Sequence, residues 1–211
     1  MSVSVVYNDG KHFYLGSNSS SGATGFNLSN TNPLIYPLFK TNDVVVSWHG
    51  NTSVLAHLFA GIDWTKIKAP LSQSMLFHNF YEPLVKALKR FSVLTPDDDN
   101  LLFDYSISLF FITKNQCFSF DKRGIAETEE IDVIGTDKLL AYDTYEVLHT
   151  QKLDGFTLVK KAVETTIKNT IDTGYPILLL RPEDKHLTMI EENGKVTKVK
   201  IPTIQAILGE E

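Results

Sequence analysis

Cysteine is almost absent from this chain of 211 residues, which contains only Cys117. One thiol cannot form an internal disulfide, which agrees with a reducing, cytoplasmic location. Basic residues are also too few and too scattered for a phosphate-binding surface, because 20 Lys and Arg stand against 25 Asp and Glu, a net charge of −5. Nucleic acid is therefore not an expected partner.

Long hydrophobic runs are missing as well. No apolar stretch approaches the roughly 20 residues that cross a bilayer, and the first residues lack the pattern of a signal peptide, so a membrane is not an expected partner. The six histidines have no zinc-site spacing, and no phosphate-loop motif occurs. The aspartates at 97–99 lack calcium-loop spacing and are interpreted as solvated turn residues. The sequence thus predicts no metal and no cofactor.

The composition is typical of a soluble globular protein, with 43% hydrophobic and 21% charged residues. A chain of this length can bury a substantial core. No internal repeat and no linker divides it. We therefore expect a single domain over 1–211.

Strand signals open the chain. Residues 1–17 read as strand, turn and strand, because Asp9-Gly10 is a strong hairpin signal between β-prone runs. The β-branched run 44–48 predicts a buried strand that ends at Gly50. Further strands are expected at these ranges: 34–39, 103–113, 116–121, 131–134, 177–180, 187–191 and 195–201.

Helical signals fall between these groups of strands. A first helix is expected after 51–52, and a second over 72–91, broken or restarted at Pro83. Two more are expected from Thr136 and from 154–155, the last one stopped by Gly174 and Pro176. Segregated strands and helix pairs predict an α+β fold built in layers.

Four pieces of the sequence resemble the proteasome β-type family, including its bacterial relatives. They are the first hairpin ending at 15–16, the step from strand to helix at 47–51, the strands leading to 134–136, and the helix ending at 172–174. The resemblance implies a four-layer αββα sandwich, the fold of the N-terminal nucleophile (Ntn) hydrolases. It also implies self-association into rings.

In that family the first residue of the mature chain is the nucleophile and its α-amine is the general base. By resemblance, the site here would comprise Ser2, after removal of Met1, with Ser17, Thr136 and Thr173 as helpers and Gly50 at the oxyanion. Counting back from Gly16 places Met1, rather than Ser2, at the nucleophile position, unless the hairpin is one residue longer.

The charged helpers of the family are replaced here. Ser17, followed by Asn18, stands where a carboxylate is expected, and the lysine position falls near Ile35 or Tyr36. Lys40 lies further along and is expected to face solvent. Because such charges tune the proton transfer, any activity should be slow, and Ser17→Asp with Tyr36→Lys should raise it.

Three hypotheses on function follow. The first is a non-catalytic or weakly active ring-forming subunit, and the second is a peptide or amide hydrolase that uses Ser2. The third is a small-ligand binding domain on an unrelated α+β fold, with a pocket between the loops at 17–25 and 95–100. Two facing sheets would speak against the third.

Three other features have simpler interpretations. His49, beside Trp48 and the Gly50 turn, is the one histidine that could approach the site, but packing or a hydrogen bond is expected rather than catalysis, because no Ser or Cys stands beside it in the sequence. Cys117 lies in an alternating strand and is expected to be a buried, inert thiol. The stretch 75–91 has more apolar residues than one helix face needs, which predicts an oligomer interface.

Overall fold

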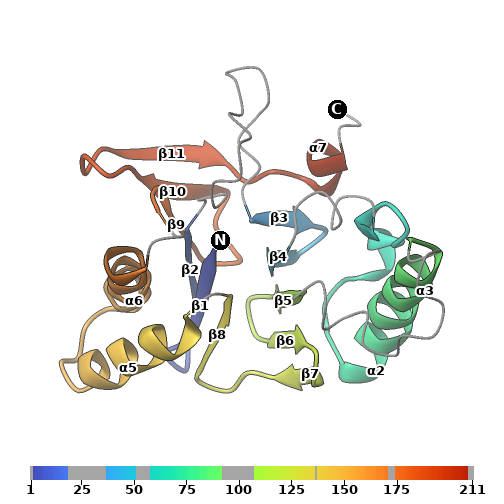
Figure 1. The fold of residues 1–211 in the computed structure, drawn as a ribbon, viewed down its shortest axis with the longest axis horizontal. Coiled ribbons are helices and arrows are strands. Elements are labelled where there is room, and N and C mark those ends of the chain that lie inside the picture. Colours follow the sequence, from blue (N-terminus) through green and yellow to red (C-terminus); the bar gives the residue numbers. More distant parts are fainter. Residues whose placement is uncertain are drawn as a thin grey trace.

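Two antiparallel β-sheets and two groups of helices form the molecule (Figure 1). The computed structural model describes residues 2–18, 37–50, 58–91, 107–135, 137–170 and 174–208. One sheet has six strands in the order β11-β10-β9-β2-β1-β8, and the other has five in the order β3-β4-β5-β6-β7.

The strands keep close to the ranges that the sequence predicts. The six-stranded sheet contains β1 (Val3–Asn8), β2 (Phe13–Asn18), β8 (Ile131–Gly135), β9 (Ile177–Leu180), β10 (His186–Ile190) and β11 (Val196–Lys200). The five-stranded sheet contains β3 (Leu38–Thr41), β4 (Val44–His49), β5 (Ser108–Ile112), β6 (Cys117–Asp121) and β7 (Gly124–Glu127). Strand β7 is the one described strand that the sequence pattern missed.

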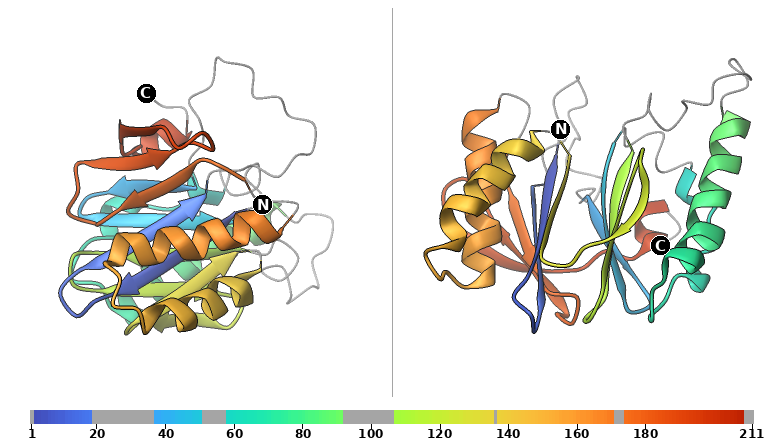
Figure 2. Two further views of the ribbon diagram at one scale, coloured as in Figure 1. Left: turned by 90° about the vertical axis from the view of Figure 1, so that its left-hand side faces the viewer. Right: turned by 90° about the horizontal axis from the view of Figure 1, so that it is seen from below.

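Helices cover the outer face of each sheet (Figure 2). The six-stranded sheet carries α5 (Lys138–His149) and α6 (Gly155–Asn169). The five-stranded sheet carries η1 (Trp64–Lys66), α2 (Gln73–Leu76), η2 (Phe77–Tyr81) and α3 (Glu82–Phe91), and α7 (Ile204–Leu208) follows β11. The α+β fold class is therefore confirmed.

Three hydrophobic cores lie between these layers of helices and sheets. Val3, Val5 and Val159 belong to the core between the six-stranded sheet and its helices. Val6 and Val45 belong to the core between the two sheets. The core beneath α2 and α3 is rich in rings, among them Phe80, which packs edge-on to Phe111 and Phe120.

Strand β4 shows why the run 44–48 is continuously apolar. Its side chains alternate, so Val44, Val46 and Trp48 enter the core beneath the helices, while Val45 enters the core between the sheets. A strand that is buried on both faces has no solvent side on which polar residues would be placed. The two polar residues at its end, Ser47 and His49, fall on the inter-sheet face and lead into the candidate site.

The helical stretch predicted over 72–91 is present and is restarted close to Pro83. Ser72 caps it, because its hydroxyl accepts a hydrogen bond from Met75 N at 3.1 Å. The π-helical turn η2 ends immediately before α3, which places Pro83 in the first turn of α3. Proline is tolerated there because a first-turn amide has no partner within its own helix.

Much of the apolar excess of this stretch lies in the core, and the interface expected there stays a prediction. Leu76, Phe80, Leu84 and Leu88 are all buried. Phe77, 41% exposed, is stacked on Tyr81 and is the most exposed large apolar side chain of the described residues 75–90.

The C-terminal segment connects the two sheets at one edge. Lys40 N donates a hydrogen bond to Pro202 O at 2.8 Å, and Lys40 forms an isolated parallel β-bridge with Thr203. Among the helices that the structure describes, none has the length and apolarity to traverse a bilayer.

Candidate functional site

The candidate site lies where β1 begins, at the end of the space between the two sheets. In β1, Ser4 pairs with Ser17 of β2, and Val3 pairs with Gly135 of β8. Side chains alternate along β1, so Ser2, Ser4 and Val6 share the inter-sheet face. This face changes from apolar at Val6 to polar at Ser4 and Ser2, opposite the polar end of β4.

Ser2 and His49 meet across the gap between the sheets. Ser2 Oγ lies 3.1 Å from His49 Nδ1, and both residues are half-buried. Burial lowers the pKa of His49, because a charged imidazole is costly to desolvate. The ring is therefore neutral at neutral pH, and its unprotonated nitrogen can accept the Ser2 hydroxyl hydrogen.

A chain of three buried hydroxyls continues inward from this pair. Ser4 Oγ lies 2.8 Å from both Ser17 Oγ and Ser47 Oγ, and Ser47 Oγ donates to Pro37 O at 3.1 Å. Each hydroxyl has one hydrogen to donate. One direction satisfies all three bonds: Ser17 donates to Ser4, Ser4 to Ser47, and Ser47 to Pro37 O.

Asn18 holds the start of β1 from the other side. Its Oδ1 accepts a hydrogen bond from Val3 N at 2.7 Å, and its Nδ2 donates to Gly174 O at 3.0 Å. The side chain is fully buried, so both of its polar ends are satisfied within the protein. Asn18 thereby joins β1, β2 and the segment before β9.

Two glycines shape the backbone around Ser2. A Cβ at Gly135 would lie 2.2 Å from Ser2 O, and its φ of +106° is also unfavourable for other residues. Gly50 follows His49 and has a φ of 142°. Its amide remains the proposed oxyanion donor.

The structure places three of the five residues that the resemblance selects close to the start of β1. Ser2 and Gly50 both adjoin His49, whereas Ser17 lies one step deeper, within the hydroxyl chain. Thr136 and Thr173 lie outside the described residues. Their neighbours Gly135 and Gly174 both contact this region.

The lysine of the family's site has no described counterpart. Ile35 and Tyr36 lie outside the described residues. Lys40 is half-buried rather than fully exposed, and its Nζ donates a hydrogen bond to Pro182 O at 2.8 Å. Within the described part of the chain, Ser2 and His49 have no hydrogen bond or ion pair to a lysine or a carboxylate.

His49 is the residue whose partner sequence reasoning missed. The expectation that no serine stands beside it considered only neighbours along the chain. The usable signal was the alternation on two strands: Ser2 and Ser4 continue the inward face of β1, and Ser47 and His49 continue that of β4. Two polar pairs at the same end of two facing strands indicate a polar site between them.

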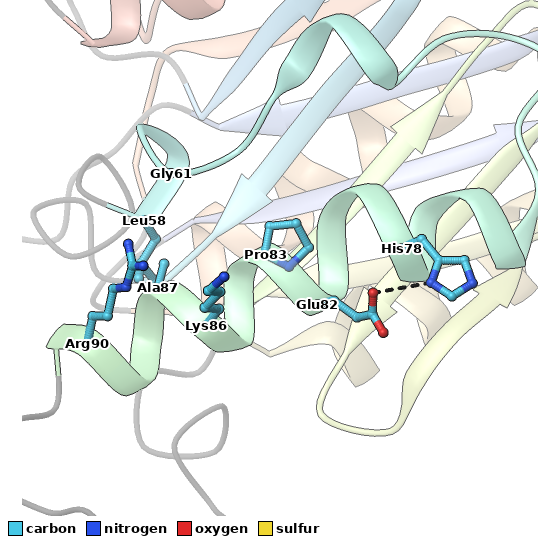
Figure 3. A pocket seen from close by; sticks show the side chains of 8 residues that line it. All are labelled: Leu58, Gly61, His78, Glu82, Pro83, Lys86, Ala87 and Arg90. Carbon is cyan, nitrogen blue, oxygen red and sulfur yellow. Dashed lines mark hydrogen bonds and ion pairs between the residues drawn. The ribbon is translucent and has the colours of Figure 1, made fainter.

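A separate groove of about 690 Å³ lies on the outer helix layer (Figure 3). Leu58, Pro83 and Ala87 form part of its wall, and charged side chains of α3 lie along it. Figure 3 shows Glu82 paired with His78, at 3.2 Å. This groove contains none of the residues expected at the N-terminal site, although most of its lining belongs to the stretch 75–91.

Metal binding and thiol chemistry find little support in the described residues. They contain no cluster of three or more His, Cys, Asp or Glu side chains that could hold a metal ion, and the aspartates at 97–99 lie outside them. Cys117 is fully buried, as expected, and burial raises the pKa of its thiol. The thiol is therefore protonated and inert at neutral pH.

Comparison with known proteins identifies the fold. No protein-family model and no curated protein sequence matches the chain. Among solved structures, Thiobacillus denitrificans BPH in complex with Epoxomicin matches with a TM-score of 0.66 at 15% identity, over 87% of this chain and all of the other. A second structure of Thiobacillus denitrificans BPH matches with a TM-score of 0.64 at 16% identity, over 86% of this chain and 97% of the other.

Eukaryotic HslV from Trypanosoma brucei matches with a TM-score of 0.52 at 16% identity, over 85% of this chain and 98% of the other. These are proteasome-type proteins, so the chain has a proteasome-like fold. At this level of identity the likeness concerns the fold alone. The chemistry of the site depends on its own residues.

Proposed function

We propose that this protein is a divergent proteasome-like subunit that assembles into rings and has a weakly active or inactive N-terminal site. The two facing sheets with outer helices would then be the four-layer αββα sandwich of the Ntn hydrolases. The single domain would span 1–211, and a peptide is the candidate substrate.

The observation that carries the weak-activity proposal is the uncharged surrounding of Ser2. Its described hydrogen-bond partner is the His49 imidazole, the next groups inward are hydroxyls and the Asn18 amide, and Ser17 contacts the Ser4 hydroxyl and backbone carbonyls where a carboxylate would be expected. A proton transfer without preorganised charges loses on the order of 10²–10³ in rate for each missing group. The site is therefore suited to slow turnover.

A second candidate function, a peptide or amide hydrolase that uses Ser2, is favoured by one contact. The distance of 3.1 Å between Ser2 Oγ and His49 Nδ1 is within the reach of a nucleophile and its base. The small-ligand hypothesis gains no such contact, and the two facing sheets speak against it.

Hydrolysis of fluorogenic peptides by protein that begins at Ser2 separates the two candidates. A rate that disappears in Ser2→Ala but survives in Ser74→Ala, an exposed serine of α2, would establish the hydrolase. Incubation with epoxomicin, the ligand of BPH, gives a second readout: a mass increase that depends on Ser2.

Assembly is tested separately by light scattering. An oligomer in solution supports the ring-forming part of the proposal. A monodisperse species close to the chain mass of 23.7 kDa at micromolar concentration would remove it, whatever the peptide assay shows.

A further inference from the structure

The pairing of Ser2 with His49 crosses between the two sheets, and it is formed by a side chain rather than by the chain's amine. Ser2 immediately precedes β1, and His49 is the last residue of β4. The neighbours of both are held in place: Val3 N is bound to Asn18, and Ser47 is bound to Ser4 and Pro37. The two reacting atoms thus belong to fixed strands of opposite sheets.

We propose that His49 Nδ1 is the general base for Ser2 Oγ, so that the site acts as a serine–histidine pair whether or not Met1 is removed. This inference rests on the weakly active form of the proposed function. An α-amine is a base only when Ser2 is the first residue, because the nitrogen of an internal Ser2 is an amide. The imidazole is independent of that processing step.

The reaction would proceed on an ester or amide. His49 Nδ1 takes the hydroxyl proton as Ser2 Oγ bonds to the carbonyl carbon, and the imidazolium then gives that proton to the leaving alcohol or amine. Water releases the acyl group, with its proton passing through His49 and one hydrogen returning to Ser2 Oγ. This requires the tautomer with hydrogen on Nε2, for which Nδ1 accepts from Ser2.

Few titratable groups lie around His49 in the described part of the chain. Among the described residues no charged side chain acts on its pKa, which burial lowers, and its pairing partner on β5 is the uncharged Ser108. When Ser2 is the first residue, its α-amine is expected to titrate at about 7.7–8.0, above an imidazole whose pKa is lowered by burial. The two possible bases therefore leave different pH profiles.

The test compares two forms of the full chain: one that begins at Ser2 after cleavage of a fusion, and one with three extra residues before Met1. A fluorophosphonate reagent reports on the activated hydroxyl, and intact mass gives the labelling rate between pH 5 and 8. The variants are Ser2→Ala, His49→Gln and, as a matched control, His78→Gln, an exposed histidine outside the site.

If His49 is the base, both forms label at similar rates, and His49→Gln slows labelling at least about 100-fold while His78→Gln does not. The wild-type rate then rises through one ionisation below pH 6.5 in both forms, a readout that needs no substitution and so survives a misfolded His49→Gln. Labelling confined to the form that begins at Ser2 and insensitive to His49→Gln overturns the inference but leaves the hydrolase. No labelling in either form overturns the inference and the hydrolase together, and leaves only the ring-forming subunit.

Discussion

The carbonyl oxygen of Ser2 lies against Gly135, at a spot where any side chain would place its Cβ only 2.2 Å away. This contact ties the nucleophile's own peptide to the end of β8. It also explains why residue 135 is a glycine, since φ there is +106°. The position of Ser2 relative to His49 therefore depends on a residue that touches neither of their side chains.

Gly135→Ala should destabilise the protein by more than about 2 kcal/mol, because strain at a positive φ adds to a clash with backbone that cannot move aside. Thermal unfolding followed by circular dichroism measures the loss. Gly194→Ala is the matched control, since its φ is +80° but nothing lies within 4 Å of the added Cβ, and it should cost about 1 kcal/mol. Equal effects of the two changes would show that the contact with Ser2 contributes nothing.

Ser4→Ala should lower the free energy of unfolding by about 1–3 kcal/mol, because it leaves the Ser17 and Ser47 hydroxyls buried with fewer partners. Urea unfolding gives the change as a lower midpoint with an unchanged slope. Ser74→Ala removes an exposed hydroxyl and should be nearly neutral. If Ser4→Ala were as stable as the wild type, the hydroxyl chain would not be a stabilising link between the sheets.

The sequence predicts the strands far better than the site, for a reason visible in Val45, Ser47 and His49. Alternation and hairpin signals are local, so they locate the strands and, through the resemblance, the layered fold. Which face meets which is a long-range property: that His49 lies opposite Ser2 depends on how two sheets stack, 47 residues apart in the chain. The apolar residues of η2 and α3 also depend on long-range packing. Phe80, Leu84 and Leu88 are buried in a core rich in aromatic side chains, which helical periodicity alone does not indicate.

Stability should fall with acid in a way that depends on His49. Its pKa is lowered in the folded protein by burial, so below the unfolded value of about 6.5 the unfolded chain gains a proton that the folded protein does not. Between pH 6.5 and the lower folded pKa, this group should reduce the free energy of unfolding by up to about 1.4 kcal/mol per pH unit. Above pH 6.5 it contributes no pH dependence.

Urea unfolding at a series of pH values tests this, with His49→Gln beside His78→Gln. The difference between wild type and His49→Gln should change between pH 7 and 5, and His78→Gln, which alters an exposed histidine outside the site, shows how much of any change is specific to His49. A His49→Gln curve parallel to the wild type across this range would mean that His49 titrates normally and is less buried than the structure indicates.

Ser17→Asp is the substitution that most sharply separates a conventional amine-based site from the one described here. The resemblance alone predicts that a carboxylate at this position, together with Tyr36→Lys, raises activity. The contacts of Ser17 favour the opposite outcome for the single change, because the hydroxyl is fully buried and lies 3.3 Å from Val3 O and 3.4 Å from Asn18 O. A carboxylate there would face two carbonyl acceptors, and among the described contacts of Ser17 only the Ser4 hydroxyl, 2.8 Å away, could donate to it, so we expect a loss of about 2–4 kcal/mol and no gain in rate.

The sign of the pH dependence identifies the cause of that loss. A buried carboxyl without a positive partner and with one hydroxyl donor has a folded pKa above its unfolded value, so the destabilisation is fully present above the folded pKa and is relieved as the pH falls through it. Ser17→Asn, close to Asp in volume but uncharged, should show no such recovery between pH 7 and 4. A Ser17→Asp protein that is stable at pH 7 and labels faster than the wild type would instead place the α-amine within reach of residue 17, and the amine rather than His49 would then be the base.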